Sequence, residues 1–222
     1  MEYEDLLSKS KWSILKELAK GEKSAVDIAK RTSQSISNVT QQLKLLEAYN
    51  LVKKTKQEQK KKPGKPKTPY ILNQEVVMAS ILKPGMADKK IIKLKEADAC
   101  QKCILNTFFL LNPEDYYYLL KFICFTDMIK KAETLAYLKA DEKEIEIMII
   151  SEQIKEIREK YSNMSVPGLV GKTKKIISWS HNRKEIEEGI ERKEEYFVNL
   201  VKNSKELFDK KDHLNELRKR TA

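Results

Sequence analysis

Cysteine and histidine are scarce in this chain of 222 residues, which has three cysteines and two histidines. Cys100 and Cys103 form a single CxxC pair, and the other candidate ligands, Cys124, His181 and His213, are scattered along the chain. A zinc site needs four ligands and usually draws them from two closely spaced pairs. We therefore expect no metal and no cofactor, although two cysteines on one helical face could also form a thiol sensor.

Residues for catalysis are also lacking. Neither histidine has a nucleophile or an acid at a recognisable spacing. The segment VPGLVGKT at 166–173 misses the first glycine of a phosphate-binding loop, because Val166 stands in its place, and no apolar strand leads into it. We expect that the protein is not an enzyme.

Long hydrophobic runs are absent as well. Every apolar run is far shorter than the ~20 residues that cross a membrane as a helix. The N-terminus is acidic and polar and does not read as a secretory signal. These features predict a cytoplasmic protein without membrane contact.

Lysine, in contrast, is abundant and unevenly distributed. The formal net charge is +11, and residues 1–75 contain 16 Lys or Arg against 9 Asp or Glu. Residues 53–67 alone contain eight lysines and one acid, Glu58. A lysine-rich composition can also reflect genome composition or a high growth temperature. The clustering, however, favours a polyanionic partner.

The segment 24–73 organises the N-terminal part of the chain. Ile36, Val39, Leu43 and Leu46 recur at helical spacing and predict a helix over 36–49 with one buried stripe. Ser35 is placed to cap its start, and Asn50 is placed to end it. The opposite face carries hydroxyls, amides and one lysine: Ser37, Asn38, Gln41, Gln42 and Lys44. Such a face suits the reading of base edges in a major groove, and a solvated helix surface gives the same pattern.

The elements around this helix favour the first interpretation. Ser24 can cap a shorter helix, and residues 30–34 form a polar turn into the second helix, as in a helix-turn-helix. Residues 51–57 and 68–73 are predicted to pair as strands, with Pro63 and Gly64 at the corner between them. A helix over 4–20 is expected to pack behind, with Trp12 in the core.

Residues 8–73 resemble the winged helix-turn-helix regulators of the ArsR and MarR type. The resemblance rests on a pattern like SxSxVSxxLKxLxxxGLV followed by a basic hairpin, with Asn50 in place of the usual glycine. The matching residues are Ser35, Ser37, Val39, Thr40, Leu43, Lys44, Leu46, Leu51 and Val52. The resemblance implies a recognition helix in the major groove, a lysine-rich wing on the backbone or in the minor groove, and a dimer.

The remaining chain is predicted to be helical. Residues 74–82 read as a last helix of the N-terminal domain, stopped by Pro84 and Gly85, so we expect domains at 1–85 and 86–222. Helices are predicted from Asn112 onwards and over 141–161 and 182–220, with a loop at 162–171. The expected fold class is therefore mainly α, with three helices and a β-hairpin wing followed by a helical C-terminal domain.

Together these features predict a sequence-specific DNA-binding transcriptional regulator. We expect double-stranded DNA as the partner, a homodimer held by the second domain, and a small-molecule or protein effector at that domain. The alternative is an adaptor in chromatin, replication or RNA processing that binds nucleic acid without sequence preference. The predicted DNA-binding residues are Ser35, Ser37, Asn38, Thr40, Gln41, Gln42, Lys44, Lys53, Lys54, Lys56, Lys60, Lys61, Lys62, Lys65 and Lys67.

Overall fold

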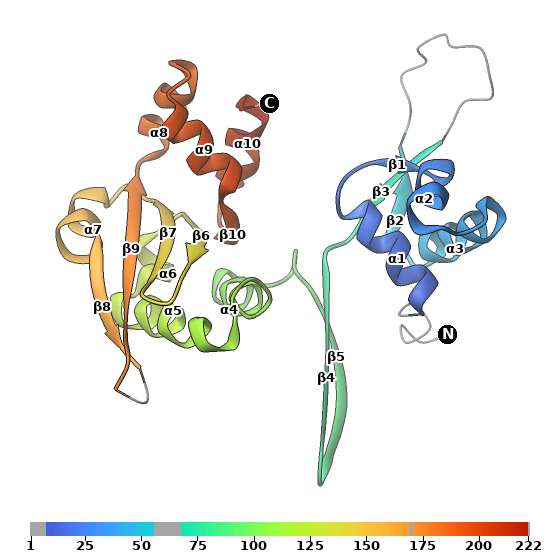
Figure 1. Cartoon of the computed structure of the whole chain (residues 1–222), viewed down its shortest axis with the longest axis horizontal. Helices are drawn as coiled ribbons and strands as arrows, with labels where there is room; N and C mark the ends of the chain where they lie inside the picture. Colours follow the sequence, from blue (N-terminus) through green and yellow to red (C-terminus); the bar gives the residue numbers. More distant parts are fainter. Residues whose placement is uncertain (1–7, 56–67, 169–170, 222) are drawn as a thin grey trace. The chain divides into compact units, whose positions relative to one another are not determined.

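The chain folds into two compact units (Figure 1), seen in a computed structural model that describes residues 8–55, 68–168 and 171–221. Unit 1 spans Met1–Lys95 and unit 2 spans Glu96–Ala222. Each unit has its own hydrophobic core, so we describe each by itself.

Unit 1 combines helices with a small antiparallel sheet. Its first elements are α1 (Lys9–Leu18), β1 (Lys23–Ser24), α2 (Ala25–Thr32), α3 (Ile36–Ala48), β2 (Val52–Lys54) and β3 (Pro69–Leu72). The three strands pair in the order β1-β3-β2. The core includes Val39, Leu43 and Leu46 of α3, which are fully buried as their helical spacing predicts.

Local side-chain chemistry sets the ends of α2 and α3. Ser24 caps α2, and Ser35 Oγ accepts a hydrogen bond from the Asn38 backbone N–H at 3.2 Å. Asn50 follows α3 with φ of 60°, the left-handed conformation that asparagine tolerates. Among the described residues, the three helices predicted before the lysine-rich turn and the two strands predicted on either side of it are confirmed, while residues 56–67 lie outside the described part of the chain.

Two apolar side chains of unit 1 are more exposed than predicted. Ile36 is 52% exposed because it is the first residue of α3 and lies before the buried part of the stripe. Trp12 is 48% exposed, so its placement in the core was wrong. Trp12 precedes the buried Ile14 by two residues, which places it about 200° away around the helix.

The predicted helix over 74–82 is instead a strand. β4 (Val76–Lys83) and β5 (Met86–Lys93) form an antiparallel hairpin, paired from Val76 opposite Lys93 to Lys83 opposite Met86. Pro84 and Gly85 make its turn, and Gly85 has φ of 78°. The run is rich in β-branched valine and isoleucine, which fit a strand better than a helix. The Pro-Gly signal therefore marks a turn inside unit 1, and the two units divide at Lys95.

Unit 2 is built on a five-stranded mixed sheet, so the prediction of a mainly α fold was wrong. Its elements are α4 (Ala99–Leu110), α5 (Pro113–Thr126), α6 (Met128–Lys131), β6 (Thr134–Ala140), β7 (Glu144–Ile150), α7 (Ile154–Tyr161), β8 (Asn163–Pro167), β9 (Thr173–His181), α8 (Arg183–Glu191), α9 (Glu195–Asn203), β10 (Lys205–Asp209) and α10 (His213–Arg220). The strand order is β10-β6-β7-β9-β8, and only β7 and β9 run parallel.

Each face of this sheet has a hydrophobic core. Ile147 and Ile149 of β7 point to one face, where they join Phe122 and Ile123 of α5. Met148 and Ile150 point to the other face, which is covered by residues of α8, α9 and α10. A strand buried on both faces is rich in β-branched residues with no polar side, as β7 is from Ile147 to Ile150.

Two of the helices predicted for unit 2 contain strands. The predicted helix over 141–161 is β7 followed by the short α7, and the predicted loop at 162–171 contains β8. The predicted helix over 182–220 is α8, α9, β10 and α10. The helix expected after Asn112 is confirmed as α5, with Pro113 in its first turn. In the parts of the chain that the structure covers, no helix has the length and apolar character to cross a membrane.

Candidate nucleic-acid interface

The outward face of α3 carries two polar side chains that are free to contact a partner. Ser37 and Gln41 are exposed and have no hydrogen bond to any described residue. They are four residues apart, so they lie one turn apart on the same face of the helix. Lys44 is also exposed and follows Gln41 by three residues, again about one turn along. This face therefore offers a hydroxyl, an amide and a cation.

Asn38 and Gln42 lie beside this face and form an amide ladder with α1. Gln34 Nε2 donates to Ser13 Oγ at 2.7 Å, and Asn38 Nδ2 donates to Gln34 Oε1 at 2.8 Å. Gln42 Nε2 in turn donates to Asn38 Oδ1 at 3.3 Å. Through Gln34 these amides help to hold α3 against α1. They also lie next to the exposed face of the helix.

The predicted residues Ser35 and Thr40 use their hydroxyls within α3. Ser35 caps the helix, and Thr40 Oγ1 donates to the Ile36 carbonyl at 2.7 Å. Both are well placed to shape the start of the helix. Neither hydroxyl is as free to read a base as that of Ser37.

The lysines of β2 flank the base of the lysine-rich turn. Lys53 and Lys54 are both exposed. Lys54 Nζ lies 2.8 Å from Glu47 Oε2 and 5.8 Å from the centre of the Tyr70 ring, and the hydrogen bond with Glu47 raises the pKa of Lys54. Lys54 is thus charged but partly neutralised, whereas Lys53 has no partner among the described residues. The remaining predicted lysines lie outside the described residues: Lys56, Lys60, Lys61, Lys62, Lys65 and Lys67.

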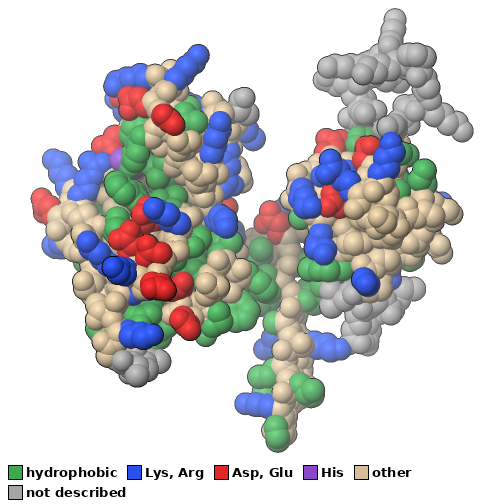
Figure 2. Space-filling view, in the orientation of Figure 1, with side chains coloured by type: hydrophobic (Ala, Val, Ile, Leu, Met, Phe, Trp, Pro, Cys, Tyr) green, Lys and Arg blue, Asp and Glu red, His purple; other side chains and the backbone are tan. Residues whose placement is uncertain are grey.

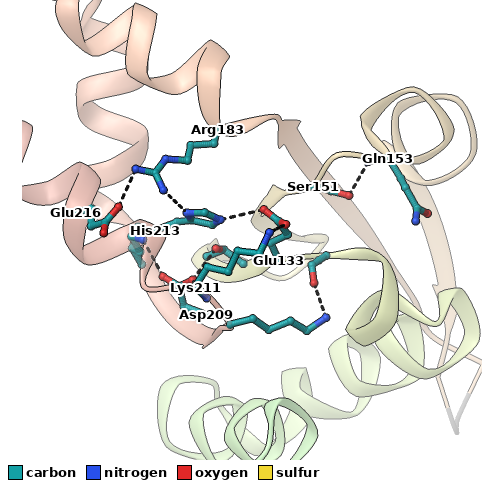
Figure 3. A network of polar contacts seen from close by, with 12 residues as sticks. Glu133, Ser151, Gln153, Arg183, Asp209, Lys211, His213 and Glu216 are labelled. Carbon is teal, nitrogen blue, oxygen red and sulfur yellow. Dashed lines mark hydrogen bonds and ion pairs between the residues drawn. The ribbon is translucent and has the colours of Figure 1, made fainter.

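Unit 2 holds a polar network at the edge of the sheet where β6 begins and β10 ends (Figure 3). The buried His213 lies with Nε2 2.9 Å from Glu133 Oε2 and Nδ1 3.0 Å from Arg183 Nη1. Arg183 Nη2 continues to Glu216 Oε2 at 2.7 Å, and Lys211 also bonds Glu133. The hydrogen bond from Lys211 lowers the pKa of the Glu133 carboxyl. Since each carboxylate meets a cation, the network fits a structural clamp between β6, α8 and α10.

A shallow groove opens on the face of the sheet that α9 only partly covers. It has a volume of about 570 Å³ and runs between β6, β7 and β9 on one side and α9 on the other. Trp179 and Tyr196 stand in it with ring centres 6.0 Å apart, above the apolar Leu138 and Leu200. Glu146 binds Trp179 Nε1 at 3.0 Å and Lys139 Nζ at 2.9 Å. Aromatic walls with a few fixed polar groups are typical of small-molecule sites.

His181 supports Tyr196 at one end of this groove. Its Nε2 lies 2.9 Å from the Tyr196 hydroxyl and its Nδ1 lies 3.1 Å from Glu185 Oε2. Burial lowers the pKa of His181 and raises the pKa of Tyr196. The imidazole is therefore neutral at pH 7 and holds the tyrosine as a neutral partner.

This pKa shift predicts a loss of stability in acid. Below about pH 6.5 the unfolded chain takes up a proton on His181 more readily than the folded chain does, so the free energy of unfolding falls as the pH falls to the lowered pKa. In His181→Gln we expect a smaller drop in melting temperature between pH 7 and pH 5 than in the unchanged protein. Thermal melts followed by circular dichroism at both pH values measure the difference. Tyr196→Phe, which keeps the histidine, should retain the full drop, and equal drops in His181→Gln and the unchanged protein would contradict the assignment.

The two cysteines of the CxxC pair differ in their exposure to solvent. Cys103 is buried in α4, and burial raises the pKa of its thiol to about 12. Cys100 and Cys124 are exposed. A thiol with so high a pKa is a weak nucleophile and a weak metal ligand at neutral pH, which favours a core role for Cys103. Among the described residues, no group of three or more His, Cys, Asp or Glu side chains is arranged as metal ligands.

The network and the groove of unit 2 have no counterpart in the sequence-based prediction. Glu133 and His213 are brought together only by the pairing of β6 with β10 and the packing of α10. Trp179 lies on β9, which was not predicted, and Tyr196 lies on α9, which was predicted as part of a single helix over 182–220. The sequence holds little signal for this strand, because the buried face of TKKIISWSH consists of Lys174, Ile176, Ser178 and Ser180, so that burial alternates along it while hydrophobicity does not.

Comparison with known proteins bears on the first unit only. A protein-family model described as HVO_A0114 matches residues 6–70, which include α1, α2, α3 and β2 and reach into β3. The N-terminal region is thus similar to that family. No curated protein matches the chain.

Proposed function

We propose that the protein is a sequence-specific DNA-binding regulator with a winged helix-turn-helix in unit 1. The observation that carries this proposal is the outward face of α3, on which Ser37 and Gln41 are exposed and unpaired among the described residues. The neighbouring amides of Asn38 and Gln42 are bonded in a chain that reaches α1 through Gln34. A helix held rigidly from behind presents its free hydroxyl and amide in a fixed geometry. Fixed donors and acceptors are what base recognition in the major groove requires.

The charges of unit 1 support a nucleic-acid partner. Lys44 and Lys53 are exposed near the helix and its flanking strand, and eight lysines lie within residues 53–67 against the single acid Glu58. Such a cluster gains affinity for phosphates by releasing counterions. The order α1-α2-α3-β2-β3 places the lysine cluster between the two strands that follow α3, as in a winged helix.

Unit 2 is proposed to act as the effector domain of this regulator. Its groove beside Trp179 and Tyr196 has the size and the aromatic lining of a small-molecule site. We also propose that the protein works as a homodimer in the cytoplasm, since two copies match the two halves of a palindromic operator. The adaptor function remains the second candidate, because lysine clusters bind any duplex without reading its sequence.

Replacing Ser37 and Gln41 together by alanine tests the proposal. Once a selected duplex is identified, we expect the ratio of its affinity to that of random duplex to fall roughly tenfold or more, because a good base contact contributes ~1 to 3 kcal/mol. The melting temperature should stay unchanged, since neither side chain bonds a described residue. Fluorescence anisotropy with both duplexes at several salt concentrations measures the ratio.

Two matched variants interpret the result. Gln153→Ala removes an exposed amide from unit 2 and should leave the affinity ratio unchanged. Asn38→Ala breaks the amide ladder and should lower both the affinity ratio and the melting temperature. An unaltered ratio in the Ser37 and Gln41 double variant would favour the adaptor function instead.

A further inference from the structure

The β4–β5 hairpin is exposed to an unusual degree for a strand pair. Every residue from Ala79 to Ile91 is exposed, and Leu82 reaches 87% exposure. Among the described strands, β4 and β5 pair only with each other. Figure 1 shows the hairpin as a long, slender ribbon. An isolated two-stranded hairpin is marginally stable in water, so this one is expected to gain a partner.

The two edges of the hairpin differ in charge. β5 carries Asp88, Lys89, Lys90 and Lys93, whereas β4 has no charged residue from Val76 to Leu82. Figure 2 shows apolar side chains gathered near the tip of the hairpin and lysines along it. Proteins protect exposed strand edges with charges, lysine above all. The edge of β5 is protected in this way, and the edge of β4 is open to strand addition.

The pairing register identifies the backbone groups on the open edge. Leu94 N–H donates to the Glu75 carbonyl at 2.9 Å, which makes Glu75 and Leu94 a hydrogen-bonded pair next to Val76 and Lys93. Hydrogen-bonded and non-bonded pairs alternate along an antiparallel ladder. The backbone N–H and C=O groups that point away from β5 therefore belong to Val76, Met78, Ser80 and Leu82.

We propose that β4 pairs antiparallel with β4 of a second copy of this chain, about a two-fold axis at Ala79. This register sets Val76 opposite Leu82 and Met78 opposite Ser80, so the outward backbone groups of both copies meet. Val77 then lies opposite Ile81 on the other face of the ribbon. No charged residue enters these pairs, and apolar cross-strand pairs stabilise a sheet.

The charge pattern favours a second copy over other occupants. Pairing through β5 would set the lysines of two chains against each other, which opposes association. A nucleic acid would be drawn to the lysines of β5 and not to the neutral edge of β4. The contact through β4 is also self-limiting, because both outer strands of the resulting four-stranded sheet are copies of β5 with lysine-lined edges. It closes as a dimer and does not grow into a fibre.

This inference names the surface of the homodimer in the proposed function, and its test does not require DNA binding. It places the dimer contact in unit 1, where the sequence alone had assigned it to the second domain. A chain that dimerises through β4 but binds no duplex would refute the proposed function and leave the dimer contact intact. A chain that binds duplex as a monomer would refute the dimer contact and leave DNA binding intact.

Ser80→Pro is the first test, because proline removes one outward N–H and leaves the hydrogen bonds between β4 and β5 in place. We expect the full-length protein to dimerise at micromolar concentration and the variant to dissociate roughly tenfold or more readily. Sedimentation equilibrium measures the dissociation constant, and circular dichroism checks the fold. Lys90→Ser on the protected strand is the matched control and should leave the dimer unchanged.

A charge pair tests the register independently of proline. Met78→Glu and Ser80→Lys in separate chains should each weaken the homodimer. Mixing the two chains should restore association, because position 78 of one chain lies opposite position 80 of the other and the new carboxylate would face the new ammonium group. A monomeric unchanged protein, a Ser80→Pro dimer as tight as the original, or no gain on mixing would overturn the proposal. So would variants that lower duplex affinity without altering the association state, since the hairpin would then be a nucleic-acid ribbon.

Discussion

Replacing Lys60, Lys61 and Lys62 by glutamine is expected to weaken binding to every duplex by a similar factor. Lysine is a point charge that makes no bidentate contact with a base, so these residues act through the release of counterions and not through base recognition. The slope of log affinity against log salt should become shallower by ~0.9 for each phosphate that is no longer neutralised, and thus by up to ~2.7 for the triple change. Anisotropy titrations over a series of salt concentrations give both quantities.

The matched control removes the same charge from the other unit. Lys143, Lys155 and Lys172 are exposed in unit 2, and their replacement by glutamine should leave the slope unaltered. A triple change at 60–62 that keeps the salt slope, or that weakens one duplex far more than the others, would argue against a purely electrostatic wing.

Lys174→Ala is expected to destabilise unit 2 by about 3 to 5 kcal/mol, the usual cost of leaving one partner of a buried ion pair alone. Lys174 on β9 forms an ion pair with Asp115 at the start of α5, and their side chains are only 8% and 12% exposed. Removing the lysine leaves the Asp115 carboxylate away from water and without its cation. Chemical denaturation of the full chain with Trp12 replaced by phenylalanine, followed through the fluorescence of Trp179, measures the change.

Two further variants separate the effect of the buried charge from that of the missing ion pair. The double change Lys174→Met with Asp115→Leu should restore most of the stability, because apolar side chains of similar size need no desolvation. Lys130→Ala breaks the exposed pair with Asp127, whose side chains are 80% and 56% exposed, and should cost at most ~1 kcal/mol. Equal losses in Lys174→Ala and Lys130→Ala would show that burial of the Lys174 pair is unimportant.

The sequence predicted unit 1 up to β3 well because each element there has its own local signal. Ser24 and Ser35 cap α2 and α3, and the stripe of Val39, Leu43 and Leu46 has only helical spacing. Beyond β3 the signals conflict. VVMASIL fits a short helix by its length and apolar character, and only its valines and isoleucine favour the strand that forms.

In unit 2 the same ambiguity affected the central strands. Ile145, Met148 and Ile149 match a helical stripe, whereas Glu144, Glu146 and the isoleucines between them also alternate as in a strand. This segment forms a strand because it pairs with β6 and β9, and the local sequence does not indicate that pairing. β10 has only five residues within a highly charged region, where it was read as part of a long helix.

The candidate nucleic-acid interface was also predictable only in part. That α3 would present Ser37 and Gln41 followed from helical spacing, because both lie opposite the buried stripe. The bonds from Gln34 to Asn38 and from Asn38 to Gln42 join residues four apart, whereas the bond that ties this ladder to Ser13 depends on the packing of α1. Spacing reveals which residues face outwards, and tertiary contacts decide which of those remain free.

The position of β10 in the sheet of unit 2 bears on how the protein is made on the ribosome. Lys205 pairs with Tyr137, so β6 stays without its outer neighbour until nearly seventy more residues have been synthesised. Unit 1 has all its internal contacts by Lys95 and can fold while unit 2 is still being translated. The nascent chain therefore carries a finished helix-and-sheet unit, with the neutral edge of β4 already exposed, well before β6 obtains its last partner. The proposed β4 contact would therefore be available to neighbouring nascent chains on one messenger RNA before unit 2 is complete.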